Sequence, residues 1–369
     1  MKVNFFSLNQ QYLSIENQIK KEINKVLKNQ DFIQGESVQQ FEKVFAEMNN
    51  SKYCVAVNSG TAALHIAYAI SDFEQSDEIL VPTNSFFSTA EAVSLANLKP
   101  VFVDADKNYH HINLEDAKNK ITKNTKAIVP VHLYGNPVNM DEILKFSKLH
   151  GLKVIEDCAQ AHFSTFKNKI VGNFGSIGCF SFYPSKNLGA YGEGGALVTN
   201  NKKLYERAIL FRNHGSKKRY VHESIGHNYR LNSIQGAVLN VKLKHINKSI
   251  DQRIKLANVY HKKIEENSNT SLPKINKDSK HVYHLFVIRH KQRDKLKNYL
   301  LENGIETSLH YPIPIHKQPA YKSSIDKYQQ MEYDQTAKEI LSLPMYPELT
   351  EKKVAFVADK INEFNLSLN

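Results

Sequence analysis

The chain has few cysteines, and their positions limit the kinds of site that it can build. Only Cys54, Cys158 and Cys179 occur in 369 residues, and no two of them have Cys-x-x-Cys spacing. This pattern argues against a disulfide framework and against a metal site built on thiolates. No His-x-x-x-His pair or carboxylate cluster points to metal instead. We therefore expect three core thiols and no metal.

Long apolar runs are also missing. Asn, His, Asp or Pro interrupts every apolar stretch within a dozen residues, so none is long enough to cross a bilayer. The first ten residues, MKVNFFSLNQ, contain no continuous apolar core and no small-residue cleavage site of a signal peptide. With 41% hydrophobic residues the chain has enough apolar material for a core. These features predict a globular, cytoplasmic protein without a membrane partner.

The net charge is +12, yet the chain lacks a basic tract interleaved with stacking aromatic residues. Its lysines are spread over amphipathic segments, as is typical of a solvated surface. We therefore expect no nucleic-acid partner. A weaker interpretation is that part of the positive field attracts an anionic small molecule.

What the chain does contain is a series of short apolar runs, most of them separated by segments of helical length. Runs without polar alternation indicate strands that are covered on both faces. The pattern therefore predicts an α/β fold with a mostly parallel, seven-stranded sheet. The seven runs lie at residues 54–57, 79–81, 101–103, 127–131, 154–155, 179–182 and 196–198.

Helical periodicity frames this sheet. Residues 8–48 show it on both sides of a break at Gly35, which predicts an N-terminal helical arm. One long helix is expected from about Asn232 to Leu256. Beyond residue 250 the chain is more basic and poorer in glycine, as in a smaller α+β domain. We predict one domain at 1–245, comprising the arm and the large α/β domain, and a second at 246–369.

Lys186 is the first candidate for chemistry. It lies between the apolar run at 179–182 and a glycine cluster at 189–195. An amine in a crowded, partly apolar pocket has a lowered pKa, and its free base can attack a carbonyl group to form a Schiff base. A simple loop lysine beside a turn is the alternative, and this stretch alone does not decide between them.

Two other strand ends carry candidate residues. The turn Ser59-Gly60-Thr61 precedes a good helix start, and a helix N-terminus suits a phosphate group. The turn is neither a Walker loop nor Gly-x-Gly-x-x-Gly, which argues against a nucleoside triphosphate or dinucleotide. Asp157 ends another run, where it either caps the next helix or holds a pyridine nitrogen protonated. By itself Asp157 favours the capping role.

Taken together, these groups match the requirements of pyridoxal 5′-phosphate (PLP). The aldehyde of PLP needs an amine, its phosphate needs backbone and hydroxyl donors, and its ring nitrogen needs a carboxylate. Lys186, the 59–61 turn with Ser181, and Asp157 would supply them. Phe86, shortly after the run at 79–81, is placed to cover the ring.

Several ordered motifs carry a family resemblance over nearly the whole chain. They are NSGTAAL at 58–64, VP at 81–82, VHLYGNPVNMD at 131–141, EDCAQAH at 156–162, SFYPSKNLG at 181–189, GEGGA at 192–196, GHNYRL at 226–231 and HYPIP at 310–314. With them the sequence resembles the sugar aminotransferases of the DegT/DnrJ/EryC1/StrS family, which are fold-type I PLP enzymes. The resemblance implies PLP as the cofactor.

The resemblance also implies roles for individual residues. Lys186 would hold the cofactor covalently and Asp157 would pair with its pyridine nitrogen. Gln160 would lie near its phenolic oxygen. Asn228 is similar to the family asparagine that reaches the phosphate from the neighbouring subunit, which implies a homodimer with shared active sites. The phosphate ligands within the chain would be Gly60, Thr61 and Ser181.

The implied reaction moves an amino group from L-glutamate to a nucleotide-linked keto-hexose carrying dTDP or UDP. The stretches at 159–162, 182–186, 188–192 and 214–220 resemble the branch that acts on 3-keto sugars. The expected product is therefore a C-3 amino sugar for a surface polysaccharide. The candidate substrate contacts, several chosen for their charge, are Tyr183, Arg219, His310, Tyr311 and His316.

Three other functions compete with this one. The first is the same reaction on a 4-keto nucleotide sugar. A dehydratase of the same family would carry histidine in place of Lys186, and the lysine speaks against it. A non-catalytic PLP-binding sensor of the same fold is the alternative from a different class.

Overall fold

The seven runs predicted as strands form one sheet in the computed structural model, which describes residues 1–321 and 331–368. The four pairs from β8 through β5, β4 and β2 to β3 are parallel, while β9 is antiparallel to both of its neighbours, β8 and β1. The predicted mostly parallel sheet is therefore confirmed. In spatial order the strands are β1 (Tyr53–Val57), β9 (Gly195–Thr199), β8 (Ile177–Ser181), β5 (Lys153–Asp157), β4 (Thr125–Ile128), β2 (Glu78–Pro82) and β3 (Lys99–Val103).

Alternate side chains of each strand pack against helices on opposite faces of the sheet. Val55 and Val57 of β1 lie in a buried cluster with α3, α4 and α7, whereas Cys54 and Ala56 pack with α2 and α8. Because both faces are covered, the strands read as continuous apolar runs. Helices α5 and α6 cover the far end of the second face. The bounds are α2 (Glu36–Met48), α3 (Gly60–Ala69), α4 (Ser88–Leu95), α5 (Leu114–Asn119), α6 (Met140–His150), α7 (Lys202–Arg212) and α8 (Ser233–Leu243).

The predicted arm is present as α1 (Asn9–Asn29), followed by α2 with Gly35 as its N-cap. Helix α1 packs along α8. The predicted single helix from 232 to 256 is wrong, because α8 ends at Leu243 and α9 (Ile246–Lys263) begins after a two-residue break. The apolar periodicity continues across this break, so the sequence pattern contained no signal for it.

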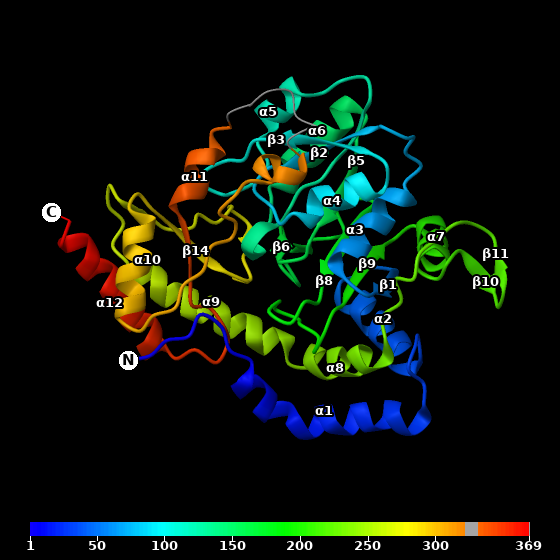
Figure 1. The fold of residues 1–369 in the computed structure, drawn as a ribbon, viewed down its shortest axis with the longest axis horizontal. Helices are drawn as coiled ribbons and strands as arrows, with labels where there is room; N and C mark the ends of the chain where they lie inside the picture. The colour runs from blue at the N-terminus through cyan, green and yellow to red at the C-terminus, as the bar shows by residue number, and fades with distance from the viewer. Residues whose placement is uncertain (322–330, 369) are drawn as a thin grey trace.

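A smaller α+β unit follows, as predicted. Helices α9, α10 (Arg293–Glu302) and α12 (Glu351–Leu366) pack with a three-stranded sheet around a separate core. The N-terminus joins this unit, since Val3 is fully buried in the same core (Figure 1). A boundary at 245/246 stays a prediction. The strands are β12 (Thr270–Ser271), β14 (Phe286–His290) and β15 (Ile340–Leu343).

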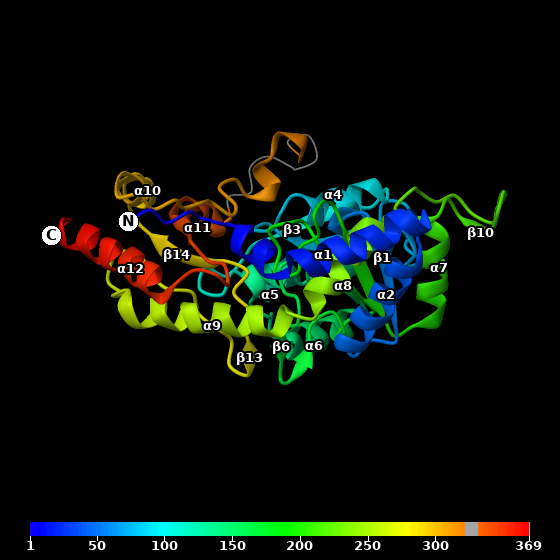
Figure 2. The same ribbon diagram turned by 90° about the horizontal axis from the view of Figure 1, so that it is seen from below.

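Short elements complete the fold. The hairpin of β10 (Ser216–Lys218) and β11 (Val221–His222) extends from the end of the molecule opposite α10 and α12 (Figures 1 and 2). The remaining elements are β6 (Thr165–Phe166), β7 (Lys169–Ile170), β13 (Ser279–Lys280), α11 (Tyr333–Glu339), and the 3₁₀ turns η1 (Leu133–Gly135), η2 (Ile315–Lys317) and η3 (Pro319–Tyr321).

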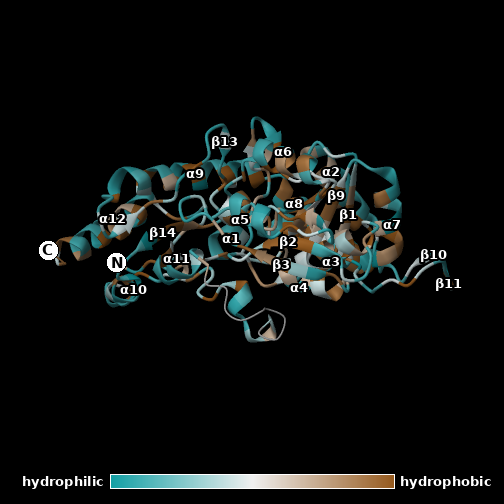
Figure 3. Ribbon diagram, turned by 90° about the horizontal axis from the view of Figure 1, so that it is seen from above, coloured by the Kyte–Doolittle hydropathy of each residue, from teal (hydrophilic) through white to brown (hydrophobic). Residues whose placement is uncertain are grey.

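Hydropathy follows this layering. Hydrophobic residues gather on the central strands around β2, and α10 on the outside is hydrophilic (Figure 3). Throughout residues 1–321 and 331–368, no helix has the length and apolar character needed to span a membrane.

Candidate active site

A cavity of about 470 Å³ opens at the carboxyl edge of the large sheet. Its walls come from the segments that follow β1, β2, β4, β5 and β8, together with His284, His310 and Tyr311 of the smaller unit. Ligands of parallel α/β sheets bind at this edge. The predicted site residues that line the cavity are Gly60, Thr61, Phe86, Asp157, Gln160, Ser181, Tyr183, Lys186, His310 and Tyr311.

Lys186 reaches the cavity from a tight turn after β8. Its backbone N–H donates to the carbonyl of Tyr183 at 2.8 Å, and Pro184 inside the turn keeps the strand from continuing. The surrounding protein desolvates the amine and lowers the pKa of Lys186 to about 8, although the nearby charge of Asp157 acts in the opposite direction. About a tenth of the amine is therefore free base at pH 7, far more than for an exposed lysine.

Asp157 ends β5 and is almost completely buried. One carboxylate oxygen accepts the hydroxyl of Thr89 at 2.8 Å, and the other accepts the N–H of Ala159 at 3.1 Å. The predicted capping role is wrong, because turns and no helix follow Asp157 over residues 158–164; its carboxylate makes a local turn bond and lines the cavity. Burial raises its pKa, and the two hydrogen bonds oppose that rise. A cation bound beside this carboxylate would compensate its desolvation.

The predicted phosphate turn begins helix α3. Ser59 is the N-cap, and its hydroxyl accepts the N–H of Ala62 at 3.0 Å. Gly60 comes so close to β8 that a Cβ at this position would lie 2.7 Å from the Cβ of Ser181. The turn therefore requires glycine and brings the hydroxyls of Thr61 and Ser181 to one wall. A helix N-terminus with adjacent hydroxyls suits a phosphate.

Gln160 and Phe86 contact the smaller unit across the cavity. The side-chain carbonyl of Gln160 accepts the N–H of Tyr134 at 2.6 Å, and its NH₂ group donates to the Tyr311 hydroxyl at 3.0 Å. The Phe86 ring lies 5.6 Å from that of Tyr311 and is 55% exposed. Half of the Tyr183 side chain is exposed at the same cavity.

Three predicted residues are not brought to this cavity. Arg219 is exposed on the β10–β11 hairpin. His316 is buried in η2, where its ring contacts the Thr83 hydroxyl and lies 3.4 Å from a carboxylate oxygen of Asp334. Asn228 is exposed, and its backbone carbonyl accepts the side-chain NH₂ group of Asn58, which follows β1. The side-chain oxygen of Asn228 accepts from Arg230 Nε at 3.0 Å.

Other residues of the site were not predicted. Thr89 follows β2 in the chain, so the strand-end rule that selected Phe86 could have selected it too. His284 and Tyr134 gave no such signal. His284 is 6% exposed, yet it lines the cavity, and burial together with the charge of Lys186 holds its pKa well below the usual value. Its imidazole is therefore neutral.

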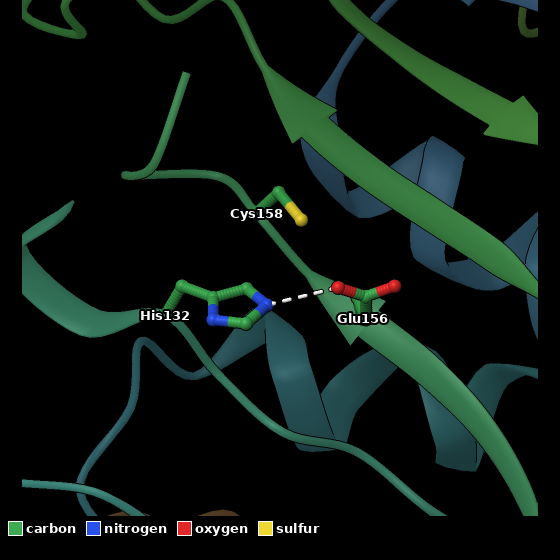
Figure 4. Close-up of side chains that lie close together, drawn as sticks. All are labelled: His132, Glu156 and Cys158. Carbon is green, nitrogen blue, oxygen red and sulfur yellow. Dashed lines mark hydrogen bonds and ion pairs between the residues drawn. The ribbon is translucent and has the colours of Figure 1, made fainter. Parts of the chain in front are cut away.

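Glu156 and Cys158, which flank Asp157 in the chain, lie close to His132 (Figure 4). The Glu156 carboxylate accepts His132 Nε2 at 3.1 Å and three backbone N–H groups of residues 172–175 at 2.7 Å each. The other ring nitrogen of His132 accepts the N–H of Val138. Burial raises the pKa of the Cys158 thiol, which keeps it protonated. Both ring nitrogens of His132 and both oxygens of Glu156 make hydrogen bonds, so we interpret the cluster as a structural clamp.

The lowered pKa of Lys186 predicts a distinct pH profile in the cofactor-free protein. Acylation of its amine should rise about tenfold per pH unit below about 8 and level off above, because only the free base reacts. Lys167 is exposed, and its hydrogen bond with Asp141 raises its pKa above the usual value for lysine. Its rate of acylation should therefore still increase with pH above 8. Peptide mass spectrometry after brief labelling measures both. Parallel profiles for the two lysines would contradict the assignment.

The residues present fit PLP. An enclosed amine with a lowered pKa, a desolvated carboxylate and a helix N-terminus with hydroxyls share one cavity. Fold and site together define a fold-type I PLP-dependent enzyme.

Comparison with known proteins identifies the family. The sequence profile of the DegT/DnrJ/EryC1/StrS aminotransferase family matches residues 13–362, and the chain belongs to this family. It is a PLP-dependent sugar aminotransferase.

Individual relatives are similar over their full length. A "dTDP-3-amino-3,6-dideoxy-alpha-D-galactopyranose transaminase" of Aneurinibacillus thermoaerophilus is 39% identical over 98% of this chain and 99% of its own. A "pleiotropic regulatory protein" of Geobacillus stearothermophilus is also 39% identical, over 99% of both chains. The crystal structure of S. venezuelae DesV in complex with a ketimine intermediate superimposes with a TM-score of 0.96, at 35% identity and 98% coverage of each chain.

Proposed function

We propose that the protein transfers the amino group of L-glutamate to C-3 of a dTDP- or UDP-linked keto-hexose. The observation that carries the proposal is the single cavity containing Lys186, Asp157 and the N-terminus of α3. The name of the transaminase from A. thermoaerophilus supports a nucleotide-linked 3-amino sugar as the product. We further propose that the reaction takes place in the cytoplasm and supplies a surface polysaccharide.

The residues of the chain divide the work as follows. PLP supplies an electron sink when its ring nitrogen is protonated, and Asp157 holds that proton. Lys186 would first bind the cofactor and then, as a free base, take the proton from the carbon that bears the amino group and deliver it to the former aldehyde carbon of the cofactor. Phe86 would cover the ring. The backbone at Gly60 and the hydroxyls of Thr61 and Ser181 would bind the phosphate.

Gln160 is proposed to lie near the phenolic oxygen of the cofactor, through the same amide that contacts Tyr311. For the sugar we propose contacts from Tyr183, His310 and Tyr311, which lie at the same cavity. Burial lowers the pKa of His310 to about 4, so its ring would bind sugar hydroxyls as a neutral group. His316 would require a different surface, because it lies outside the cavity.

A homodimer with shared active sites accompanies this proposal. The Asn228 oxygen is occupied by Arg230, which leaves its NH₂ group as an outward donor suited to a phosphate. The hairpin that carries Arg219 also carries exposed Tyr220 and extends from the end of the molecule opposite α10 and α12 (Figure 2). Both features fit a site completed by a second copy. Sedimentation of the wild type as a monomer would contradict the dimer.

The test is incubation with L-glutamate and a panel of dTDP- and UDP-linked 3-keto and 4-keto sugars. NMR of the product reads the carbon that carries nitrogen. We expect amination at C-3 of at least one 3-keto sugar and at least about tenfold lower kcat/KM for its 4-keto counterpart, a difference of about 1.4 kcal/mol. Preferential amination at C-4 would replace the proposal by its closest alternative.

A sensor is the second candidate, and the name of the G. stearothermophilus relative favours it. A non-catalytic protein would leave bound PLP unchanged when glutamate is added. We expect conversion of the cofactor to its amine form together with 2-oxoglutarate release. Failure of this half-reaction in cofactor-saturated wild type would favour the sensor.

A further inference from the structure

Four residues form a closed circuit of hydrogen bonds around one side of the cavity. Tyr134 donates its backbone N–H to Gln160 Oε1 at 2.6 Å, and Gln160 Nε2 donates to the Tyr311 hydroxyl at 3.0 Å. Tyr311 follows His310 in the chain, and the carbonyl of His310 accepts the Tyr134 hydroxyl. The circuit thus joins the large sheet unit to the wall contributed by the smaller unit.

Tyr134 is the member of this circuit that contacts both units without reaching the cavity. It lies in η1, is 3% exposed, and its carbonyl accepts the N–H of Leu285 at 3.3 Å. Burial raises the pKa of Tyr134, so its hydroxyl stays a donor at every working pH. The ring is enclosed by a buried cluster that includes Val131, Leu133 and Leu285, which leaves it little freedom to move.

The backbone at this point is shaped to aim the tyrosine. Tyr134 has φ +61°, which is uncommon for an aromatic residue, and Gly135 follows with φ +93°. A Cβ at Gly135 would lie 2.8 Å from a methyl group of Val282. The motif Leu-Tyr-Gly therefore places one backbone donor toward Gln160 and one hydroxyl toward His310. None of the proposed catalytic steps uses this motif.

We propose that Tyr134 is a positioning residue that sets the placement of the His310–Tyr311 wall for the sugar substrate. The inference rests on the proposed function, since it assigns the wall to the sugar rather than to glutamate. Removing the hydroxyl frees the His310 carbonyl but leaves the backbone bond to Gln160, and it leaves Lys186 and Asp157 untouched. The defect should therefore fall on one half-reaction only.

The test compares Tyr134→Phe with Tyr260→Phe. Tyr260 is also fully buried and donates its hydroxyl to a backbone carbonyl, that of Pro344 at 3.0 Å, but it lies in the core of the smaller unit. Loss of one neutral hydrogen bond should lower kcat/KM for the keto-sugar half-reaction about 3- to 10-fold in Tyr134→Phe. The glutamate half-reaction should stay within about twofold of wild type. Tyr260→Phe should leave both rates unchanged.

Hydrogen–deuterium exchange of the full chain provides a readout that does not depend on turnover. Peptides covering residues 308–313 should exchange faster in Tyr134→Phe than in wild type or Tyr260→Phe. Unchanged exchange there, or equal loss in both half-reactions, would overturn the inference. An inactive wild type with the expected exchange difference would instead refute the sugar aminotransferase proposal and keep Tyr134 as the residue that holds this wall.

Discussion

Lys186→Ala is expected to lose covalent attachment of PLP and to slow transamination about 10⁴-fold, because one side chain supplies both the linkage and the proton transfer. Enclosure lowers the pKa of this amine to about 8, which increases the share of free base that both tasks need. Borohydride reduction followed by mass spectrometry measures attachment, and 2-oxoglutarate formation measures the rate. Wild-type protein that retains no reduced cofactor would contradict the assignment.

Lys242→Met is the matched control for this variant. Lys242 is only 6% exposed, and burial lowers its pKa to about 8 as well. Its amine lies 4.2 Å from the Tyr191 ring in a different part of the fold and does not line the cavity with Asp157. The control should keep the reduced cofactor and the rate. A loss of attachment and rate in Lys186→Ala alone would therefore result from the position of Lys186 in the cavity and not merely from the removal of a buried amine.

The large sheet could be predicted from sequence because its strands are covered on both faces. Each predicted run, such as 54–57 or 79–81, lies within or overlaps a strand. The same topology explains why Lys186 and Asp157 could be found. Parallel strands bring their carboxyl ends to one edge, so polar residues after buried runs converge even when they are far apart in the chain.

Features that depend on tertiary contacts could not be predicted in this way. The break between α8 and α9 interrupts a continuous apolar pattern, and only the packing of α9 on the second core reveals it. The positive charge that His316 can carry suggests a substrate contact, but its ring is buried beside Asp334, outside the cavity. The contact of Tyr134 with His310 joins residues 176 positions apart, and no local pattern encodes it.

Asp157→Asn is expected to lower kcat about 10²- to 10³-fold with little change in stability. Asparagine can still accept from Thr89 or Ala159, but it carries no charge to keep the pyridine nitrogen protonated. The absorption spectrum and rate of the holoenzyme measure this effect, and thermal unfolding of the cofactor-free protein measures stability. An unchanged rate would show that the carboxylate does not serve the ring.

For the neighbouring variant Glu156→Gln we expect the opposite result, a loss of stability with little change in the rate. Glu156 faces the other side of β5, where its oxygens accept from His132 and from three backbone N–H groups. An amide NH₂ group placed against these donors leaves buried groups unpaired, which should cost about 2–4 kcal/mol of unfolding free energy. The rate per folded holoenzyme should stay within about threefold of wild type. Because the two carboxylates are adjacent in the chain, a rate loss confined to Asp157→Asn and a stability loss confined to Glu156→Gln would separate the chemistry of the cavity from the clamp behind it.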